Sequence, residues 1–328
     1  MNLLIISHSA CHPRQLWFYQ EVAKHFNHVG IIAPKRWGKL SLQDYTEDNL
    51  YAKSCPVNNA GNLANFQFLA VENVIKLFPF KPDMVLVQQE WWSKATLCLI
   101  PTIDKLKTSN ILFTWENIRK PSATEQQTIK YFDSIIVGNK DAYNICQDIT
   151  SKINLLPQVG VDTQIFRPIY TTKIYDLIFT GRPVIEKGID LIEQAANQLN
   201  LELKIVANQD YASIPAELAI AKIFISLPKT TPSWKEQCGG YAALEAMACG
   251  LPVITTDSGA VPEYLQNYAV IIPEKELTLD RICQEIQILI NSETLRRDFS
   301  RGGRALVETF YSNEVIAKKL ANILKRTI

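Results

Sequence analysis

Two cationic residues stand where the sequence predicts a ligand. In FTGRPVIEKGIDLI (179–192), an apolar strand ends, Gly181 turns the chain, and Arg182 and Lys187 follow before a helix. Ligands of open parallel sheets bind beyond the carboxyl ends of the strands, so both cations are expected at a binding site. Arg offers a planar fork to phosphate oxygens and Lys a compact charge. The alternative is that both are solvated surface charges.

A second segment, EQCGGYAALEAMACG (236–250), reads as a glycine-rich turn that enters a helix. Glycines before a helix N-terminus leave backbone N–H groups available to an anion. Together with the two cations, this helix start suits a diphosphate. Glu245, about one turn inside the helix, could then accept hydrogen bonds from paired hydroxyls such as those of a ribose. The alternative makes the glycines a tight helix–sheet contact and Glu245 a structural acid.

Short apolar runs alternate with longer amphipathic stretches, which predicts parallel sheets covered by helices. The pattern restarts after Pro168, so we predict an α/β protein with two doubly wound, Rossmann-like domains facing each other across a cleft. The domains are expected at 1–168 and 169–309, with a C-terminal helix at 310–328 that returns to the first domain. Predicted strands lie at 3–7, 29–33, 84–88, 111–114, 134–138, 153–157, 176–181, 203–207, 222–227, 252–256 and 269–272, and predicted helices lie near 14–26, 93–106 and 139–149 and from residue 187 onward.

Composition and charge give no support for a nucleic-acid-binding or a membrane-spanning protein. The chain has 328 residues, of which 47% are apolar and 20% charged, and its net charge of +1 gives no support for a nucleic-acid partner. Seven dispersed cysteines without CxxC spacing indicate reduced thiols. No signal peptide or membrane span is apparent, so a cytoplasmic location is expected. The segment RQLWFYQEVAKHF (14–26) predicts either a peripheral membrane contact or an ordinary covering helix.

Several motifs together resemble the nucleotide-sugar-dependent glycosyltransferases of family 4, which have the GT-B fold. They are VGVDTQIFRP (159–168), FTGRPVIEKGIDLI, EQCGGYAALEAMACGLPVI and SGAVPE (258–263), in the family's order. The resemblance implies that Arg182 and Lys187 neutralise the donor's diphosphate and that Glu245 holds the ribose. The donor-binding residues expected on this basis are Gly181, Gln237, Gly239, Gly240, Tyr241, Ala242 and Glu245.

The chain departs from the family at the acid that contacts the transferred sugar. In the family's Glu-x7-Glu motif this acid lies eight positions before the second, where the chain has Gln237, while Glu236 lies nine before it. Either the loop carries one extra residue and Glu236 contacts the sugar, or Gln237 replaces the acid. We favour Glu236, because a WKEQ run in this loop also looks like a family variant.

Residues after strand ends of the first domain are candidates for the acceptor side. Many relatives carry a glycine-rich first loop and a histidine in the middle of this domain, but the chain has SHSACHPRQ and TWENI there. His8 is therefore the candidate catalytic histidine. Aromatic faces stack on sugar rings and carboxylates bind hydroxyls. The other acceptor-side candidates are His12, Glu90, Trp91, Trp115 and Glu116, with packing as the alternative for each tryptophan.

The predicted activity is transfer of a sugar from a UDP-sugar or GDP-sugar to a hydroxyl of an acceptor sugar, a lipid-linked glycan or a small metabolite. No Asp-x-Asp occurs, so we expect no metal and no cofactor, and the cations would stabilise the leaving diphosphate. Retention of anomeric configuration is implied by the resemblance alone. A nucleotide-sugar epimerase and a catalytically silent nucleotide-sugar-binding subunit remain alternatives, whereas the absence of GxGxxG after the first strand disfavours a dinucleotide-dependent oxidoreductase.

Overall fold

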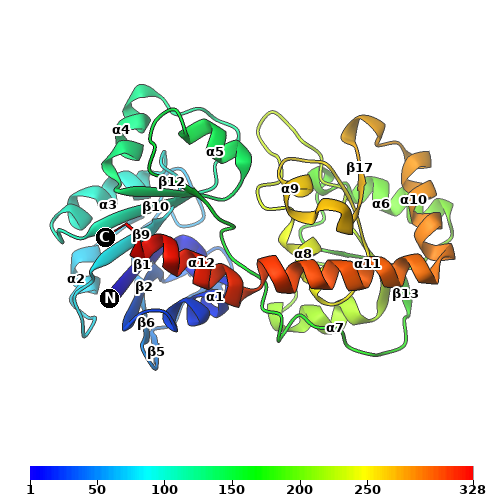
Figure 1. Ribbon diagram of the computed structural model, residues 1–328, viewed down its shortest axis with the longest axis horizontal. Helices are drawn as coiled ribbons and strands as arrows, with labels where there is room; N and C mark the ends of the chain where they lie inside the picture. The colour runs from blue at the N-terminus through cyan, green and yellow to red at the C-terminus, as the bar shows by residue number, and fades with distance from the viewer. Residues whose placement is uncertain (328) are drawn as a thin grey trace. The chain divides into compact units, whose positions relative to one another are not determined.

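The computed structural model describes residues 1–327, which form two compact units (Figure 1). The first unit contains Met1–Gly160 together with the chain from Ile316 onward, and the second contains Val161–Val315. Helix α12 (Asn313–Lys325) therefore begins in the second unit and continues into the first.

The division comes after residue 160 rather than after the predicted residue 168. The segment in between is hydrogen-bonded to the end of the second unit, where Val161 N–H donates to Tyr311 O at 2.8 Å and Asn313 N–H donates to Val161 O at 2.8 Å. Arg304 also donates to Phe166 O at 2.6 Å. These bonds make the segment part of the second unit.

The first unit is built on an eight-stranded sheet in which every strand pair is parallel except β5–β6. Its spatial order is β12 (Ile153–Leu155), β11 (Ser134–Val137), β10 (Ser109–Thr114), β9 (Met84–Gln88), β1 (Asn2–Ser7), β2 (His28–Pro34), β6 (Leu50–Cys55) and β5 (Tyr45–Glu47). The central strands are buried on both faces, which explains their continuous apolar runs. The order reverses between β1 and β9, as in doubly wound dinucleotide-binding sheets.

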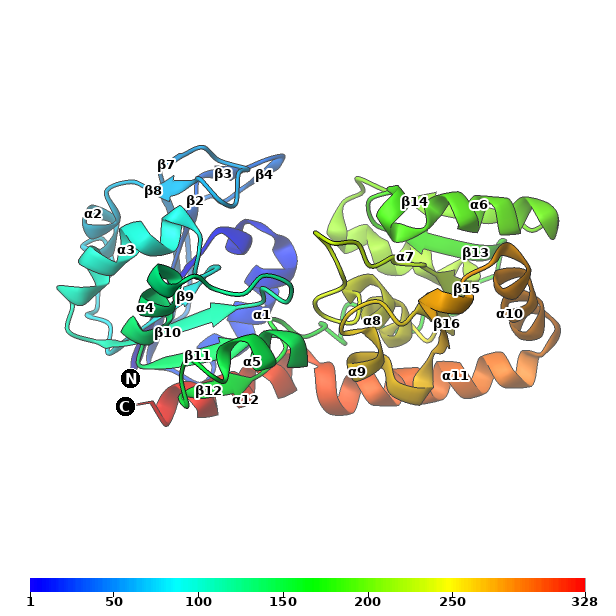
Figure 2. The same ribbon diagram turned by 90° about the horizontal axis from the view of Figure 1, so that it is seen from above.

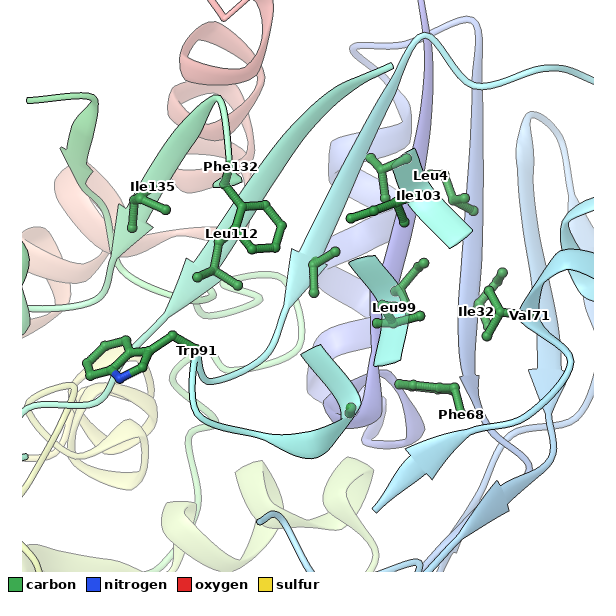
Figure 3. Close-up of a cluster of buried hydrophobic side chains, with 14 of the residues drawn as sticks. Leu4, Ile32, Phe68, Val71, Trp91, Leu99, Ile103, Leu112, Phe132 and Ile135 are labelled. Atoms are coloured by element: carbon green, nitrogen blue, oxygen red, sulfur yellow. The ribbon is translucent and has the colours of Figure 1, made fainter. Parts of the chain in front are cut away.

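Helices cover both faces of this sheet. The core of one face joins strand residues such as Leu4 and Leu112 to Leu99 of α3 and Phe132 after α4 (Figure 3). The helices of the unit are α1 (Pro13–Ala23), α2 (Val71–Ile75), α3 (Lys94–Asp104), α4 (Ala123–Tyr131), α5 (Lys140–Cys146) and α12, and two short hairpins, β3 (Arg36–Trp37) with β4 (Leu40–Ser41) and β7 (Val57–Asn58) with β8 (Gln67–Phe68), extend from the sheet.

The second unit has a five-stranded, fully parallel sheet, most of whose strands are labelled in Figure 2. Its order is β14 (Leu203–Val206), β13 (Tyr175–Thr180), β15 (Ala221–Ile225), β16 (Val253–Thr256) and β17 (Val270–Ile272). Helices α6 (Ile189–Gln198) and α10 (Leu279–Asn291) share one core with the sheet. The remaining helices are α7 (Ile214–Ala219), α8 (Tyr241–Ala248), α9 (Val261–Leu265) and α11 (Glu293–Leu306), with short turns of helix at η2 (Ile185–Lys187) and η3 (Tyr211–Ser213).

Candidate functional site

A cavity of about 240 Å³ lies at the carboxyl edge of the second sheet. The strand order reverses between β13 and β15, and the open crevice at such a reversal is where ligands of these sheets bind. The loops after both strands contribute to the cavity wall, with Gly181 and Arg182 following β13 and Pro228 following β15. The wall also includes Lys187, Glu236, Gly239, Gly240, Tyr241 and Ala242, all of which the sequence had marked as site residues.

Helix α8 begins at the cavity wall. Gly240 is its N-cap residue and supplies no side-chain hydrogen bond to the first turn, and Tyr241 and Ala242 of that turn line the cavity. The first backbone N–H groups of a helix have no partner within the helix, and the helix dipole favours negative charge there. Gly239 has a φ of +69°, and a Cβ at this position would overlap the side chain of Tyr264. The glycine therefore permits close packing of the turn that precedes the helix.

Lys187 and Glu236 form an ion pair in the cavity wall. The side chain of Lys187 is 24% exposed and that of Glu236 7% exposed. Lys187 Nζ also lies 4.8 Å from the centroid of the Trp234 ring, within the range of a cation–π contact. Arg182 is exposed and lines the same cavity. The cavity wall thus contains two cations, one of which is paired with a buried carboxylate.

The turn at 258–260 holds the backbone of Glu236. Ala260 N–H donates to Glu236 O at 3.0 Å, and Glu236 N–H donates to Ser258 Oγ at 3.5 Å. Gly259 has a φ of +53°, and a Cβ there would overlap Glu236 O. The sequence marked SGAVPE as a motif but did not reveal this role. Gln237, the other candidate for the contact with the transferred sugar, does not line the cavity.

Glu245 lies in the middle of α8, is only 3% exposed, and is not part of the cavity wall. Its Oε1 accepts a hydrogen bond from Tyr211 Oη at 2.5 Å. Tyr211 belongs to η3, which follows strand β14. The sequence did not mark Tyr211, because no motif surrounds it.

In the first unit, His8 follows β1 at the point where the strand order reverses. His8 Nδ1 is 2.8 Å from Gln89 Oε1, and Gln89 follows the adjacent strand β9. Burial lowers the pKa of His8 to about 4, although the hydrogen bond to Gln89 opposes this shift. The rings of Trp37 and Trp115 lie 4.7 and 6.2 Å from the His8 ring, measured between centroids. His8 is thus a neutral imidazole among aromatic rings.

His12 and Glu90 have structural partners. His12 is the N-cap of α1, and its Nδ1 accepts from Arg14 N–H at 3.1 Å. Burial, assisted by the charge of Arg14, lowers the pKa of His12 to about 4. Glu90 is 1% exposed and accepts hydrogen bonds from the Thr114 hydroxyl and from Glu116 N–H. Burial raises the pKa of Glu90 to about 8, so the side chain is mostly protonated at neutral pH.

The expectation that Trp91 contacts an acceptor is wrong. Its side chain is 0% exposed and belongs to the hydrophobic core of the first unit (Figure 3). Trp115 is half-buried near His8 and keeps part of its surface accessible. Glu116 accepts from Trp92 Nε1 at 2.9 Å and from Ile118 N–H at 3.0 Å, so it organises its own loop.

Within residues 1–327, no group of three or more His, Cys, Asp or Glu side chains is arranged to hold a metal ion. Among the described helices, none has both the length and the apolar composition needed to cross a membrane.

Comparison with known proteins matches a family model within the second unit and curated relatives over part of the chain. A family model described as "Glycosyl transferases group 1" matches residues 186–306. A GDP-mannose-dependent monoacylated alpha-(1-6)-phosphatidylinositol monomannoside mannosyltransferase from Corynebacterium glutamicum is 29% identical over 185 residues, which are 54% of this chain and 46% of that protein. The capsular polysaccharide biosynthesis glycosyltransferase CapM from Staphylococcus aureus is 34% identical over 85 residues, which are 26% of this chain and 22% of that protein. The chain therefore matches less than half the length of these curated relatives.

Solved structures resemble almost the whole chain. Sucrose-phosphate synthase from Thermosynechococcus elongatus has a TM-score of 0.74 at 14% identity, covering 99% of this chain and 98% of that one. The Anabaena protein HepE in complex with UDP-glucose has a TM-score of 0.71 at 11% identity, covering 99% and 100%. At these identities the likeness shows the fold, which is GT-B with two Rossmann-like domains.

Proposed function

We propose that this chain is a glycosyltransferase that moves a sugar from a nucleoside diphosphate sugar to an acceptor hydroxyl. The observation that carries the proposal is the cavity of the second unit, where Arg182, Lys187 and the N-terminus of α8 converge at the reversal of strand order. Two cations and a helix N-terminus suit a diphosphate better than any uncharged ligand. The group 1 glycosyltransferase match over residues 186–306 supports the same reading.

In this proposal the diphosphate is the leaving group. Negative charge grows on it as the sugar–phosphate bond breaks, and Arg182, Lys187 and the first turn of α8 stabilise that charge. Glu236, beside Lys187, accepts hydrogen bonds from hydroxyls of the transferred sugar, while Glu245 accepts them from the ribose. We further propose that the reaction retains anomeric configuration and proceeds without a metal ion, as the resemblance to family 4 implies.

The base of the donor is proposed to be uracil or guanine. A relative is named as GDP-mannose-dependent, and a protein with a similar fold was solved with UDP-glucose. For the acceptor we propose a hydroxyl of a sugar, a lipid-linked glycan or a small metabolite, with His8 and Trp115 of the first unit as contact residues. A cytoplasmic protein with peripheral membrane contact would suit a lipid-linked acceptor.

Thermal melting and product analysis test the proposal together. The purified chain is melted with UDP, GDP, ADP and TDP and with their common sugar conjugates. A ligand at about 100 times its Kd should stabilise the folded chain by about 2.7 kcal/mol. Release of the nucleoside diphosphate is then measured with the best donor and a panel of acceptors. Binding without transfer to any acceptor would favour the silent subunit, and no binding at all would overturn the proposal.

A further inference from the structure

Tyr211 connects the buried acid of α8 to the loop after strand β14. Its hydroxyl donates to Glu245 Oε1 at 2.5 Å, a length typical of a hydroxyl that donates to a carboxylate. Because all strands of the second sheet are parallel, this loop lies at the same edge as the cavity. The contact is between residues 34 positions apart in sequence, so it depends on the tertiary fold and not on local structure.

Tyr211 is itself held by a second set of contacts. Its ring centroid lies 5.3 Å from that of Phe166, which is fully buried. Arg304 of α11 donates to Phe166 O at 2.6 Å and to Ala248 O at 2.5 Å. The Arg304 guanidinium therefore links Phe166 to Ala248, the last residue of α8. Tyr211 links Phe166 to Glu245 of the same helix. The position of the Tyr211 hydroxyl is fixed by packing and not only by its hydrogen bond.

We propose that Tyr211 is a positioning residue for the donor, which orients the Glu245 carboxylate toward the ribose 2′- and 3′-hydroxyls. The inference rests on the proposed function, in which Glu245 binds the ribose. A carboxylate has about four lone-pair positions, so a ribose diol can share it with the Tyr211 hydroxyl. Holding the carboxylate in one orientation before binding lowers the ordering cost of binding, which raises affinity.

The test separates the ribose from the rest of the nucleotide. Binding of UDP, GDP and their 2′-deoxy counterparts is measured by calorimetry for the unmodified chain, Tyr211→Phe, Glu245→Gln and the double variant. The ribonucleotide that binds best should bind Tyr211→Phe about tenfold more weakly, since one hydrogen bond to a charged group is lost. The 2′-deoxy form should lose less than about threefold. Tyr211→Phe should add no further loss in the Glu245→Gln background, because it acts through that carboxylate.

Tyr170→Phe is the matched control, because this tyrosine is 99% exposed. It should leave all affinities unchanged. Tyr211→Phe retains the ring that packs on Phe166, so cooperative melting is expected. Equal losses for ribonucleotide and 2′-deoxynucleotide, or additive losses in the double variant, would show that Tyr211 is only a structural tie and would overturn the inference. Failure of the unmodified chain to bind any nucleoside diphosphate or its sugar conjugates would overturn the proposed function instead, so the two failures are distinguishable.

Discussion

Removal of the Lys187 ammonium should have separable effects on stability and on turnover. Lys187→Ala breaks the ion pair with Glu236 and the contact with the Trp234 ring. The lysine is about one quarter exposed, so solvent screens the pair, but the carboxylate left behind is nearly buried. We expect a loss of about 1–2 kcal/mol in the free energy of unfolding, between the values for exposed and buried pairs.

The effect of Lys187→Ala on turnover should be larger, because the leaving diphosphate carries more charge in the transition state than in the bound donor. Loss of one preorganised charge donor costs about 3 kcal/mol, or roughly a hundredfold in rate. Turnover at saturating donor should fall by about that factor, while the apparent KM for the donor changes far less. The measurement is release of nucleoside diphosphate across a range of donor concentrations, with thermal melting of the same samples.

Lys229→Ala provides the control for Lys187→Ala. Lys229 Nζ pairs with Asp190 Oδ1 at 3.1 Å, and its side chain is 28% exposed, close to the value for Lys187. Lys229 does not line the cavity. Because the carboxylate of Asp190 is 39% exposed, the replacement of Lys229 should lower stability by less than Lys187→Ala does and leave turnover near normal. Near-normal turnover in Lys187→Ala, or equal losses in both variants, would refute the assignment of Lys187 to the leaving group.

Four further predictions address other parts of the site and the first unit. Glu236→Ala should lower turnover more than Gln237→Ala, with little effect of either on binding of the free nucleoside diphosphate; the reverse order would assign the sugar contact to Gln237. Gly259→Ala should lower turnover at least tenfold, roughly 1.4 kcal/mol, because the added Cβ overlaps Glu236 O; calorimetry should still detect nucleoside diphosphate binding, and normal turnover would contradict the role of the turn. Excess chelator should leave donor affinity within about threefold, roughly 0.7 kcal/mol, and a tenfold loss would indicate a metal site. Burial raises the pKa of Glu90 from 4.5 to about 8, so the folded chain holds a proton that the unfolded chain releases. The free energy of unfolding should therefore fall as pH rises from about 5 to about 8, and denaturant titrations should show that Glu90→Gln removes this contribution; an identical pH slope in both proteins would contradict it.

The sheets were predictable because their strands are buried on both faces. MVLVQ at 84–88 coincides with β9, and KIFISL at 222–227, which is mostly apolar, overlaps β15. Strand β6 was missed, since LYAKSC is only partly buried and carries Lys and Ser within it. The hairpins of the first unit were missed because their strands are two residues long, too short to show any period.

The cavity of the second unit was predictable to the extent that it depends on strand ends. Gly181 and Arg182 follow β13 directly, so the rule for parallel sheets was sufficient to place them. The pairing of Lys187 with Glu236 was not predictable, because it joins loops 49 residues apart whose conformations are set by tertiary contacts. Trp91 shows the same limit, because the sequence does not reveal whether the ring of a tryptophan just after a strand packs inward or faces solvent.

The connectivity of the first unit has a consequence for its synthesis. Helix α12 contributes buried side chains such as Ile316, Leu320 and Leu324, and Lys325 Nζ lies 5.4 Å from the Phe26 ring centroid. Residues 161–315 are translated between the main part of the unit and this helix. At about 5–20 residues per second, a ribosome needs roughly 8 to 30 seconds for that stretch. The nascent first unit therefore exposes the apolar surface that α12 covers until the second unit has emerged, and a chaperone that binds this surface has that interval in which to act.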